Sequence, residues 1–268
     1  MTKKYIVANW KNHPDSVAEA EDILAYIDEH LRKSSEALAK EGKVSLIICP
    51  PFVFLDDVSR ILNTSRLAGQ AELGAQDIAL ADSGAWTGEV SGPMLKRLGV
   101  KYVIVGHSER RWKIGESDEV VNKKLKTILA NEFTPIVCVG ERERIFSAEG
   151  GSASGEKKFL QKQVEATFVS LSADEIGKCI IAYEPVWAIS SNPDAYPDTP
   201  ESALESIKII QEVLNTKYLI LNIRILYGGS VTASNVKDFL SLDQIAGVLV
   251  GGASIKKEEF VQILKKLD

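Results

Sequence analysis

The sequence has 268 residues, 45% of them hydrophobic, which suits one large domain or two small ones with a sizeable core. Its formal net charge of −5 argues against a nucleic acid or an anionic membrane as partner, so any anion site must be built locally. No apolar run approaches the roughly 20 residues of a membrane span, and the N-terminal run is too short for a signal peptide.

Apolar, β-rich runs recur along the chain, and short runs of this kind bounded by breakers indicate buried strands. In chain order they are Tyr5–Ala8, Val44–Cys49, a weaker one near Leu67–Ala75, Tyr102–Val105, Ile136–Val139, Cys179–Tyr183, Ile223–Tyr227 and Gly247–Val250. Stretches with helical periodicity lie between them, at Ser16–Ala39, Asp56–Leu62, Asp118–Asn131, Glu156–Leu171, Pro200–Leu214, Ser234–Leu240 and Lys256–Leu267.

Alternation of strand and helix predicts an α/β fold with a parallel sheet, and continuous apolar strands indicate burial on both faces. Eight such units fit a closed (β/α)₈ barrel, for which about 250 residues is typical. The competing architecture is a doubly wound open sheet, but no glycine-rich dinucleotide fingerprint follows the first strand. Since no composition break marks a second domain, we expect a single barrel domain over residues 1–268.

Cysteine and histidine positions exclude two kinds of site. Cys49, Cys138 and Cys179 each lie inside an apolar run without close spacing, which predicts buried, reduced thiols rather than a disulfide framework or a zinc site. The three histidines are scattered along the chain, so their spacing offers no metal cluster.

Active sites of this fold lie at the carboxyl ends of the strands. The polar or glycine residues that directly follow the predicted strands are Asn9, Lys11, Gln76, Asp77, His107, Ser108, Glu109, Glu184, Gly228, Gly229, Ser230, Gly251, Gly252 and Ser254. One lysine, one histidine, one glutamate and two glycine pairs therefore converge on one face.

Glu184 follows four apolar residues and Tyr183, and Pro185 then ends the run. A carboxylate at the end of a buried strand is partly desolvated, which raises its pKa toward the range that suits a general base. The plainer interpretation is a strand-end glutamate that meets solvent or an arginine.

The glycine pairs 228–229 and 251–252 follow the last two predicted strands, where this fold usually binds phosphate. Glycines let backbone N–H groups approach a ligand closely. Paired glycines could also simply form tight turns.

Three ionisable groups have both a chemical and a structural interpretation. His107 precedes a helical-looking segment, whose N-terminus would keep the imidazole neutral; alternatively it is a strand-end histidine held by a backbone bond. Lys11 could neutralise a phosphate or an enediolate, or be a solvated surface lysine. Glu109 could act in the site or only pair with Lys11 or an arginine.

Other features suggest structural roles. The charged run Glu141–Arg144 suggests a solvated helical face, and Trp86 and Trp112 suggest packing residues.

Six segments, in order along essentially the whole chain, resemble the triosephosphate isomerase family. They are Asn9–Lys11, Gly84–Ser91, Val105–Arg111, Ala182–Ile189, Tyr227–Val231 and Val250–Ser254. The resemblance implies a TIM barrel and an intramolecular aldose–ketose isomerase that interconverts dihydroxyacetone phosphate and glyceraldehyde 3-phosphate through an enediolate.

The same resemblance implies roles for particular residues. Glu184 is the base and neutral His107 the electrophile, as in the family's known pKa tuning. Lys11 and Asn9 stabilise negative charge, and Glu109 belongs to the same catalytic set. Substrate contacts fall to Asn9, Lys11, Ser190, Ser230, Gly251 and Gly252. The resemblance implies no metal or organic cofactor. It implies a cytoplasmic protein that forms a homodimer through the loop that carries Thr87.

The chain departs from the family after Ile189. There the family has a short Gly-Thr-Gly stretch that closes over the phosphate, whereas Ser190–Asp198 is longer, contains no glycine and adds two prolines and two carboxylates. We call this stretch the lid segment. Thr199-Pro200 still predicts a normal start for the next helix. The altered segment leaves two alternatives, an isomerase of another small sugar phosphate or a non-catalytic phosphate-binding barrel.

Overall fold

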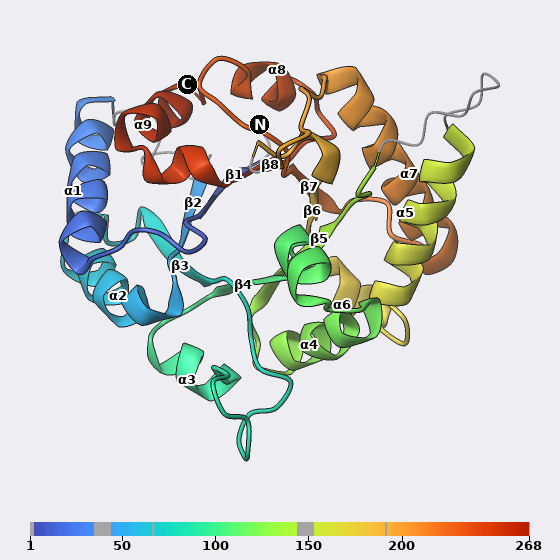
Figure 1. The fold of residues 1–268 in the computed structure, drawn as a ribbon, viewed down its shortest axis with the longest axis horizontal. Coiled ribbons are helices and arrows are strands. Elements are labelled where there is room, and N and C mark those ends of the chain that lie inside the picture. Colours follow the sequence, from blue (N-terminus) through green and yellow to red (C-terminus); the bar gives the residue numbers. More distant parts are fainter. Residues whose placement is uncertain (1–2, 35–43, 66, 144–152, 191, 268) are drawn as a thin grey trace.

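A computed structural model describes residues 3–34, 44–65, 67–143, 153–190 and 192–267. Its strands are hydrogen-bonded in sequence order, all parallel, and β1 pairs with β8, so the sheet closes into a barrel (Figure 1). They are β1 (Lys4–Asn9), β2 (Val44–Cys49), β3 (Ala71–Ala75), β4 (Tyr102–Val105), β5 (Thr134–Val139), β6 (Ile180–Tyr183), β7 (Arg224–Tyr227) and β8 (Gly247–Val250).

Helices surround this barrel (Figure 1). In chain order they are α1 (Val17–Ser34), α2 (Leu55–Thr64), α3 (Gly92–Arg97), α4 (Asp118–Ala130), α5 (Ala153–Thr167), α6 (Ala173–Gly177), α7 (Pro200–Tyr218), α8 (Val236–Leu240) and α9 (Lys257–Lys265). The predicted (β/α)₈ barrel is therefore confirmed. Among the described residues, no helix is both long and apolar enough to cross a membrane.

The strands are apolar on both faces because each face packs against a different layer. Side chains such as Val7, Ile47 and Ile104 fill the inside of the barrel, whereas alternate neighbours such as Ile6 and Ile48 pack against the helices. Two buried layers require continuous apolar strands, which explains why the sequence lacks the alternation of a half-exposed sheet.

Some strands and helices begin or end at other residues than the sequence predicted. The weak third strand shortens to β3, and α3 and α6 were not predicted because each is only one to two turns long. The start of α7 was predicted correctly: the side chain of Thr199 accepts a hydrogen bond from the N–H of Ser202, and Pro200 occupies the first turn. The predicted residues 35–39 of the first helix lie outside the described part of the chain.

The three cysteines are buried and unoxidised, as predicted. Burial raises the pKa of Cys179 to about 12, and burial together with the nearby Glu184 carboxylate raises that of Cys138 well above its usual value. These thiols fill space rather than act as nucleophiles.

Candidate active site

Glu184 lies directly after β6, with 2% of its surface exposed. Its Oε2 accepts a hydrogen bond of 2.8 Å from the backbone N–H of Ser108. Its Oε1 lies 3.0 Å from Nε2 of His107, but no donor among the described residues is aligned to hydrogen-bond with it. One carboxylate oxygen is thus buried and able to accept a proton.

His107 follows β4 and is 7% exposed. Its Nδ1 accepts a hydrogen bond of 3.2 Å from the backbone N–H of Glu109. A ring nitrogen that accepts an N–H carries no proton itself, so in a neutral imidazole this contact places the proton on Nε2. Nε2 lies beside Glu184, and His107 lines the pocket described below.

Lys11, just beyond β1, points back toward the end of β4. Its Nζ lies 3.1 Å from Oε1 of Glu109, and its side chain is 20% exposed, so it is not a freely solvated surface lysine. Burial by itself would raise the pKa of Glu109, but the charge and hydrogen bond of Lys11 hold it below the ordinary value. Glu109 is therefore held as the anionic partner of Lys11.

The backbone at Lys11 has φ = 55°, in the left-handed region that costs a non-glycine residue on the order of 1 kcal/mol. Two side chains hold it there. Oδ1 of Asn9 accepts from the Lys11 N–H at 3.1 Å, and Nε2 of Gln76 donates to the Lys11 carbonyl at 2.8 Å and to that of Cys49 at 3.0 Å. The strained turn fixes the direction in which the lysine leaves the strand.

A small cavity of about 40 Å³ joins these groups to the glycine loops. Its lining residues are Asn9, Lys11, His107, Glu184, Ile189, Ser190, Gly228, Gly229, Ser230, Val231, Leu249, Gly251, Gly252 and Ala253. All the residues to which the family resemblance assigns a catalytic or substrate-binding role line it except Glu109, which contacts Lys11. The strand-end residues Gln76, Asp77, Ser108 and Ser254 do not line it.

The glycines beside this cavity leave room for the functional side chains. A Cβ at position 228 would lie 2.9 Å from Cγ of Glu184 and 3.1 Å from the carbonyl oxygen of Tyr183. A Cβ at position 251 would lie 3.0 Å from Cε of Lys11. Gly228 is thus favoured by its close approach to Glu184 and to a backbone oxygen, and Gly251 lies close against the Lys11 side chain.

The prediction of a solvated face at Glu141 was wrong. Glu141 is 2% exposed, and its Oε1 accepts hydrogen bonds from the hydroxyl of Tyr183 (2.7 Å) and Nε1 of Trp187 (2.8 Å). Its carbonyl accepts from the N–H of Val186 at 3.0 Å. Glu141 therefore ties the end of β5 to the chain on both sides of Glu184. The signal was present, because Glu141 follows a strand as closely as the other site residues do.

Asp77 was a strand-end residue that the sequence singled out, and the structure places it in a buried ion cluster. Its Oδ2 lies 2.6 Å from Nζ of Lys124 and 2.7 Å from Arg110, both of which also contact Glu116 at 2.7 Å. Burial, more than these neighbours, sets the pKa of Asp77, which is raised. This cluster braces the loops behind His107 rather than facing the cavity.

Trp86 and Trp112, which the sequence suggested as packing residues, are both exposed, although Trp112 stacks against Phe159 with ring centroids 6.5 Å apart. They are 45% and 41% exposed, Trp86 on the loop between β3 and α3 and Trp112 on the π-helical segment Arg110–Ile114. Arg142 lies over the Trp112 ring, 5.7 Å from its centroid.

Within the described ranges, no group of three or more histidine, cysteine or acidic residues is placed to hold a metal ion.

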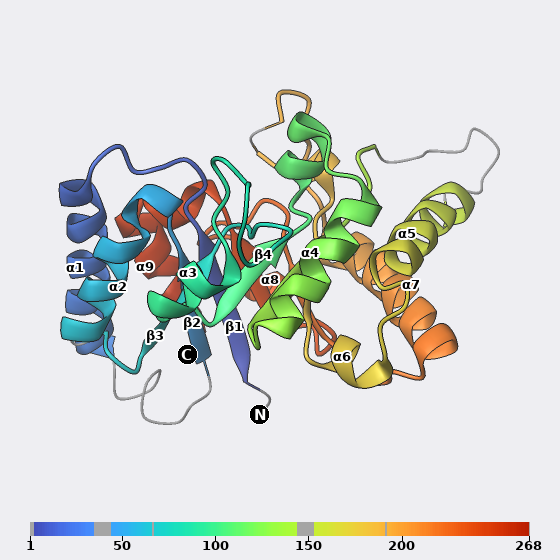
Figure 2. The same ribbon diagram turned by 90° about the horizontal axis from the view of Figure 1, so that it is seen from below.

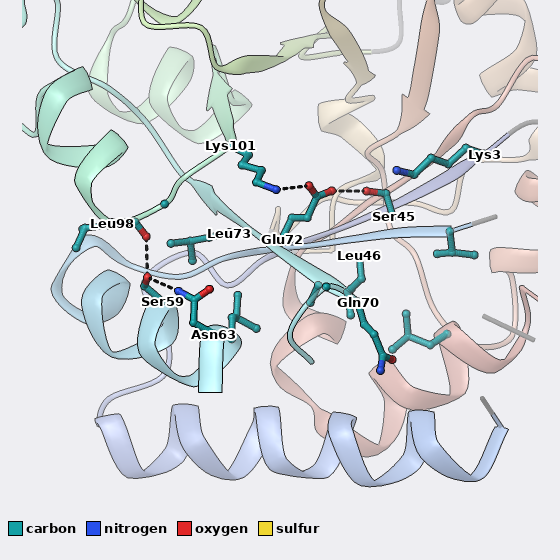
Figure 3. A pocket seen from close by; sticks show the side chains of 16 residues that line it. Lys3, Ser45, Leu46, Ser59, Asn63, Gln70, Glu72, Leu73, Leu98 and Lys101 are labelled. Carbon is teal, nitrogen blue, oxygen red and sulfur yellow. Dashed lines mark hydrogen bonds and ion pairs between the residues drawn. The ribbon is translucent and has the colours of Figure 1, made fainter. Parts of the chain in front are cut away.

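A larger cavity, of about 370 Å³, lies at the opposite end of the barrel, beside the first residues of β2 and β3. Figure 3 shows Glu72 between Ser45 and Lys101, whose side chains donate to its carboxylate at 2.9 and 3.3 Å. This end of the fold serves stability in barrels of known function, and the groups here are paired with one another.

Comparison with known proteins agrees with the fold. The family model described as triosephosphate isomerase matches residues 4–267. A triosephosphate isomerase of Lactobacillus helveticus is 38% identical over 263 residues, covering 98% of both chains. Those of Clostridium botulinum (strain Loch Maree) and Caldanaerobacter subterraneus are 38% and 37% identical over 267 and 270 residues, covering 98% of this chain and 99% of each relative. The chain therefore belongs to the triosephosphate isomerase family, and so to the aldose–ketose isomerase class of enzymes.

Proposed function

We propose that this protein interconverts dihydroxyacetone phosphate and glyceraldehyde 3-phosphate, as a step of glycolysis and gluconeogenesis, with Glu184 as the base. The observation that carries the proposal is the buried pair of Glu184 and His107. Oε1 of the glutamate lies 3.0 Å from Nε2 of the histidine and accepts no hydrogen bond from the described residues. A buried carboxylate beside a neutral imidazole can take a proton from carbon and move protons between oxygens.

In the proposed reaction, Glu184 removes a proton from C1 of dihydroxyacetone phosphate. The electron pair of that C–H bond forms the C1–C2 double bond, and the carbonyl pair moves to the C2 oxygen. His107 donates its Nε2 proton to that oxygen and recovers one from the C1 oxygen. Glu184 then returns a proton to C2. Lys11 and Asn9 stabilise the negative charge of the enediolate by electrostatics and hydrogen bonding.

The substrate phosphate would bind to the backbone N–H groups near Ser230, Gly251 and Gly252, with Ser190 closing over it. These residues line the same 40 Å³ cavity as His107 and Glu184, which supports this assignment. In a protein of net charge −5, backbone N–H groups and Lys11 provide the local positive potential that a phosphate needs.

Glu184 must turn before it can act, because its Oε2 is held by the N–H of Ser108. Gly228 has no Cβ at the point where the Cγ of Glu184 would meet one, so the side chain has space for that rotation. We propose that substrate binding exchanges the Ser108 contact for contact with the C1–C2 atoms, and that the lid segment closes over the occupied site.

We also propose a cytoplasmic homodimer formed through the loop that carries Thr87. Residues 82–89 of this loop are exposed, including Trp86, and the loop projects from the barrel between β3 and α3 (Figures 1 and 2). A protruding loop with an exposed tryptophan is a suitable contact for a second copy, which would cover it near the Lys11 turn.

A direct assay separates this function from its alternatives. We expect purified protein to convert dihydroxyacetone phosphate to glyceraldehyde 3-phosphate, measured by a coupled dehydrogenase, and to convert larger sugar phosphates poorly. No turnover of any sugar phosphate, combined with binding of 2-phosphoglycolate, would identify a non-catalytic phosphate-binding barrel. Turnover of a different sugar phosphate alone would identify another isomerase.

A further inference from the structure

Tyr196 belongs to the lid segment and packs against the turn that follows Glu184. Its ring stacks on that of Trp187, with centroids 4.7 Å apart and planes at 25°. Its backbone N–H donates to the carbonyl of Trp187 at 3.2 Å. The chain beyond Ser190 therefore folds back on itself, and Tyr196 contacts its own stem through both ring and backbone.

Trp187 offers a fixed surface for this contact. It is 4% exposed, and its Nε1 donates to Oε1 of Glu141, the oxygen that also accepts from Tyr183. These bonds join Trp187 to the ends of β5 and β6, and hence to the strand that carries Glu184. A ring stacked on Trp187 is thereby positioned relative to the base.

Local hydrogen bonds hold the described residues between the two rings. The N–H of Asn192 donates to the carbonyl of Ile189 at 2.8 Å, and the Asn192 side chain donates to the carbonyl of Val186 at 3.4 Å. The N–H of Ala195 donates to the carbonyl of Asn192 at 3.1 Å. These bonds, together with Pro193 and the absence of glycine from the sequence here, limit the conformations open to this stretch.

The far end of the lid segment lies near the barrel at a second place. Burial first, and then the neighbouring Asp198 carboxylate, raise the pKa of the Tyr227 hydroxyl at the end of β7. That hydroxyl lies over Gly229, where a Cβ would come within 2.2 Å of it. The lid segment therefore begins at the cavity, beside Ile189 and Ser190, and ends near Gly229, which also lines the cavity.

We propose that Tyr196 is a positioning residue for the isomerase reaction: by stacking on Trp187 it holds the glycine-free lid segment in a preformed shape, so that Ile189 and Ser190 keep water away from the enediolate. This inference rests on the proposed function. An aromatic pair of this geometry shifts a local opening equilibrium by about 3- to 10-fold. A preformed segment loses less conformational entropy on closing than a flexible glycine loop does.

Loss of the stack should appear first as faster opening of the segment. In hydrogen–deuterium exchange on the free protein, we expect Tyr196→Ala to raise exchange of the Asn192–Asp198 amides by about 3- to 10-fold. Tyr196→Phe, which keeps the ring, should exchange like the wild type. Asp194→Ala is the matched control, because that side chain is exposed in the same segment. Unchanged exchange in Tyr196→Ala would overturn the inference, whether or not the protein is an isomerase.

The second readout is the fate of the enediolate. If water enters, the C1 oxygen reforms a carbonyl, the double bond moves to C2–C3, the C3–O bond breaks, and phosphate leaves; the remaining enol becomes methylglyoxal. We expect Tyr196→Ala to form about 3- to 10-fold more methylglyoxal per isomerised product, with Tyr196→Phe near wild type. This ratio does not depend on the fraction of folded enzyme. An equal ratio in all variants, with active wild type, would refute the role of Tyr196; an inactive wild type would refute only the proposed function.

Discussion

Nε2 of His107 lies 3.0 Å from Oε1 of Glu184, and both side chains are buried at the mouth of the barrel. The other ring nitrogen accepts from the N–H of Glu109, so a neutral ring carries its proton on Nε2, beside the carboxylate. A charged imidazolium at this distance would hold the carboxylate in an ion pair and weaken it as a base. The proposed reaction therefore needs the neutral ring, and the segment after β4 provides the backbone contact that suits it.

The space at Gly228 gives a prediction about the mobility of Glu184. A Cβ there would lie 2.9 Å from the glutamate Cγ and 3.1 Å from a backbone oxygen that cannot easily move. We expect Gly228→Ala to lower kcat by more than about 10-fold, because a displacement of 1 Å at a reacting group can cost about 100-fold. Steady-state kinetics measure this.

Gly177→Ala is the control for that substitution, since a Cβ at Gly177 meets no atom within 4 Å. Its kcat should match the wild type. Equal activity of Gly228→Ala and Gly177→Ala would show that Glu184 does not need the free space beside it.

Lys11 and Glu109 can be separated by their charges. Lys11→Met removes the cation that faces the substrate, and we expect kcat/KM to fall by about 100-fold or more. Glu109→Gln removes only the partner of that cation, 3.1 Å from it, and should cost less than about 10-fold. If Glu109→Gln is as damaging as Lys11→Met, Glu109 has a catalytic role of its own rather than a supporting one.

The pKa of Glu109 sets the pH range in which this pair is charged. Since the folded-state pKa is depressed, the stabilisation from the ionised pair is fully present above the ordinary carboxyl pKa and is lost as pH falls through the depressed value. The pair therefore stays intact from neutral pH down through the ordinary carboxyl range, and a change of wild-type activity near neutral pH cannot come from titration of Glu109.

The buried cluster around Lys124 predicts a pH-dependent loss of stability. Lys124→Met removes one of the two cations that Asp77 and Glu116 share and leaves them with Arg110, and breaking a buried pair in this way costs about 3–5 kcal/mol. The pKa of Asp77 is already raised by burial and should rise further. A group with a raised folded pKa favours folding below its unfolded pKa and loses that effect as pH rises through the folded value.

Urea unfolding at pH 5 and pH 8 checks this prediction. The free energy of unfolding of Lys124→Met should lie closer to that of the wild type at pH 5, because protonated carboxyls need no cation. Lys123→Met is the control, as its ion pair with Glu119 is exposed and should contribute little at either pH. An equal deficit for Lys124→Met at both pH values would contradict the assignment.

The barrel was predictable because each apolar run is a strand buried on both faces, a pattern that survives in the sequence without knowledge of contacts. The cavity-lining residues were predictable for a related reason: in a closed parallel barrel all strand ends meet on one face, so Asn9, His107 and Glu184 must be neighbours. Position along the strand was sufficient to select them.

Contacts between side chains from different strands, loops and turns were not predictable in the same way. Glu141 lies in a run of alternating charges that looks solvated, yet two donors from β6 and the following turn bury it. The pairing of Asp77 with Lys124 joins residues 47 positions apart, and the stacking of Tyr196 on Trp187 depends on a turn without a sequence signature. Such contacts depend on the directions of side chains, which periodicity does not specify.

The central claim is that Glu184 takes a proton from C1, and hydrogen exchange into the substrate tests it most directly. Incubation of dihydroxyacetone phosphate with wild-type protein in D₂O should replace one of the two C1 hydrogens by deuterium. NMR measures the rate of this replacement. We predict that Glu184→Gln, which keeps the size of the side chain, lowers this exchange by about 10²- to 10⁴-fold. Exchange by Glu184→Gln within a few-fold of the wild-type rate would contradict the assignment of Glu184 as the base.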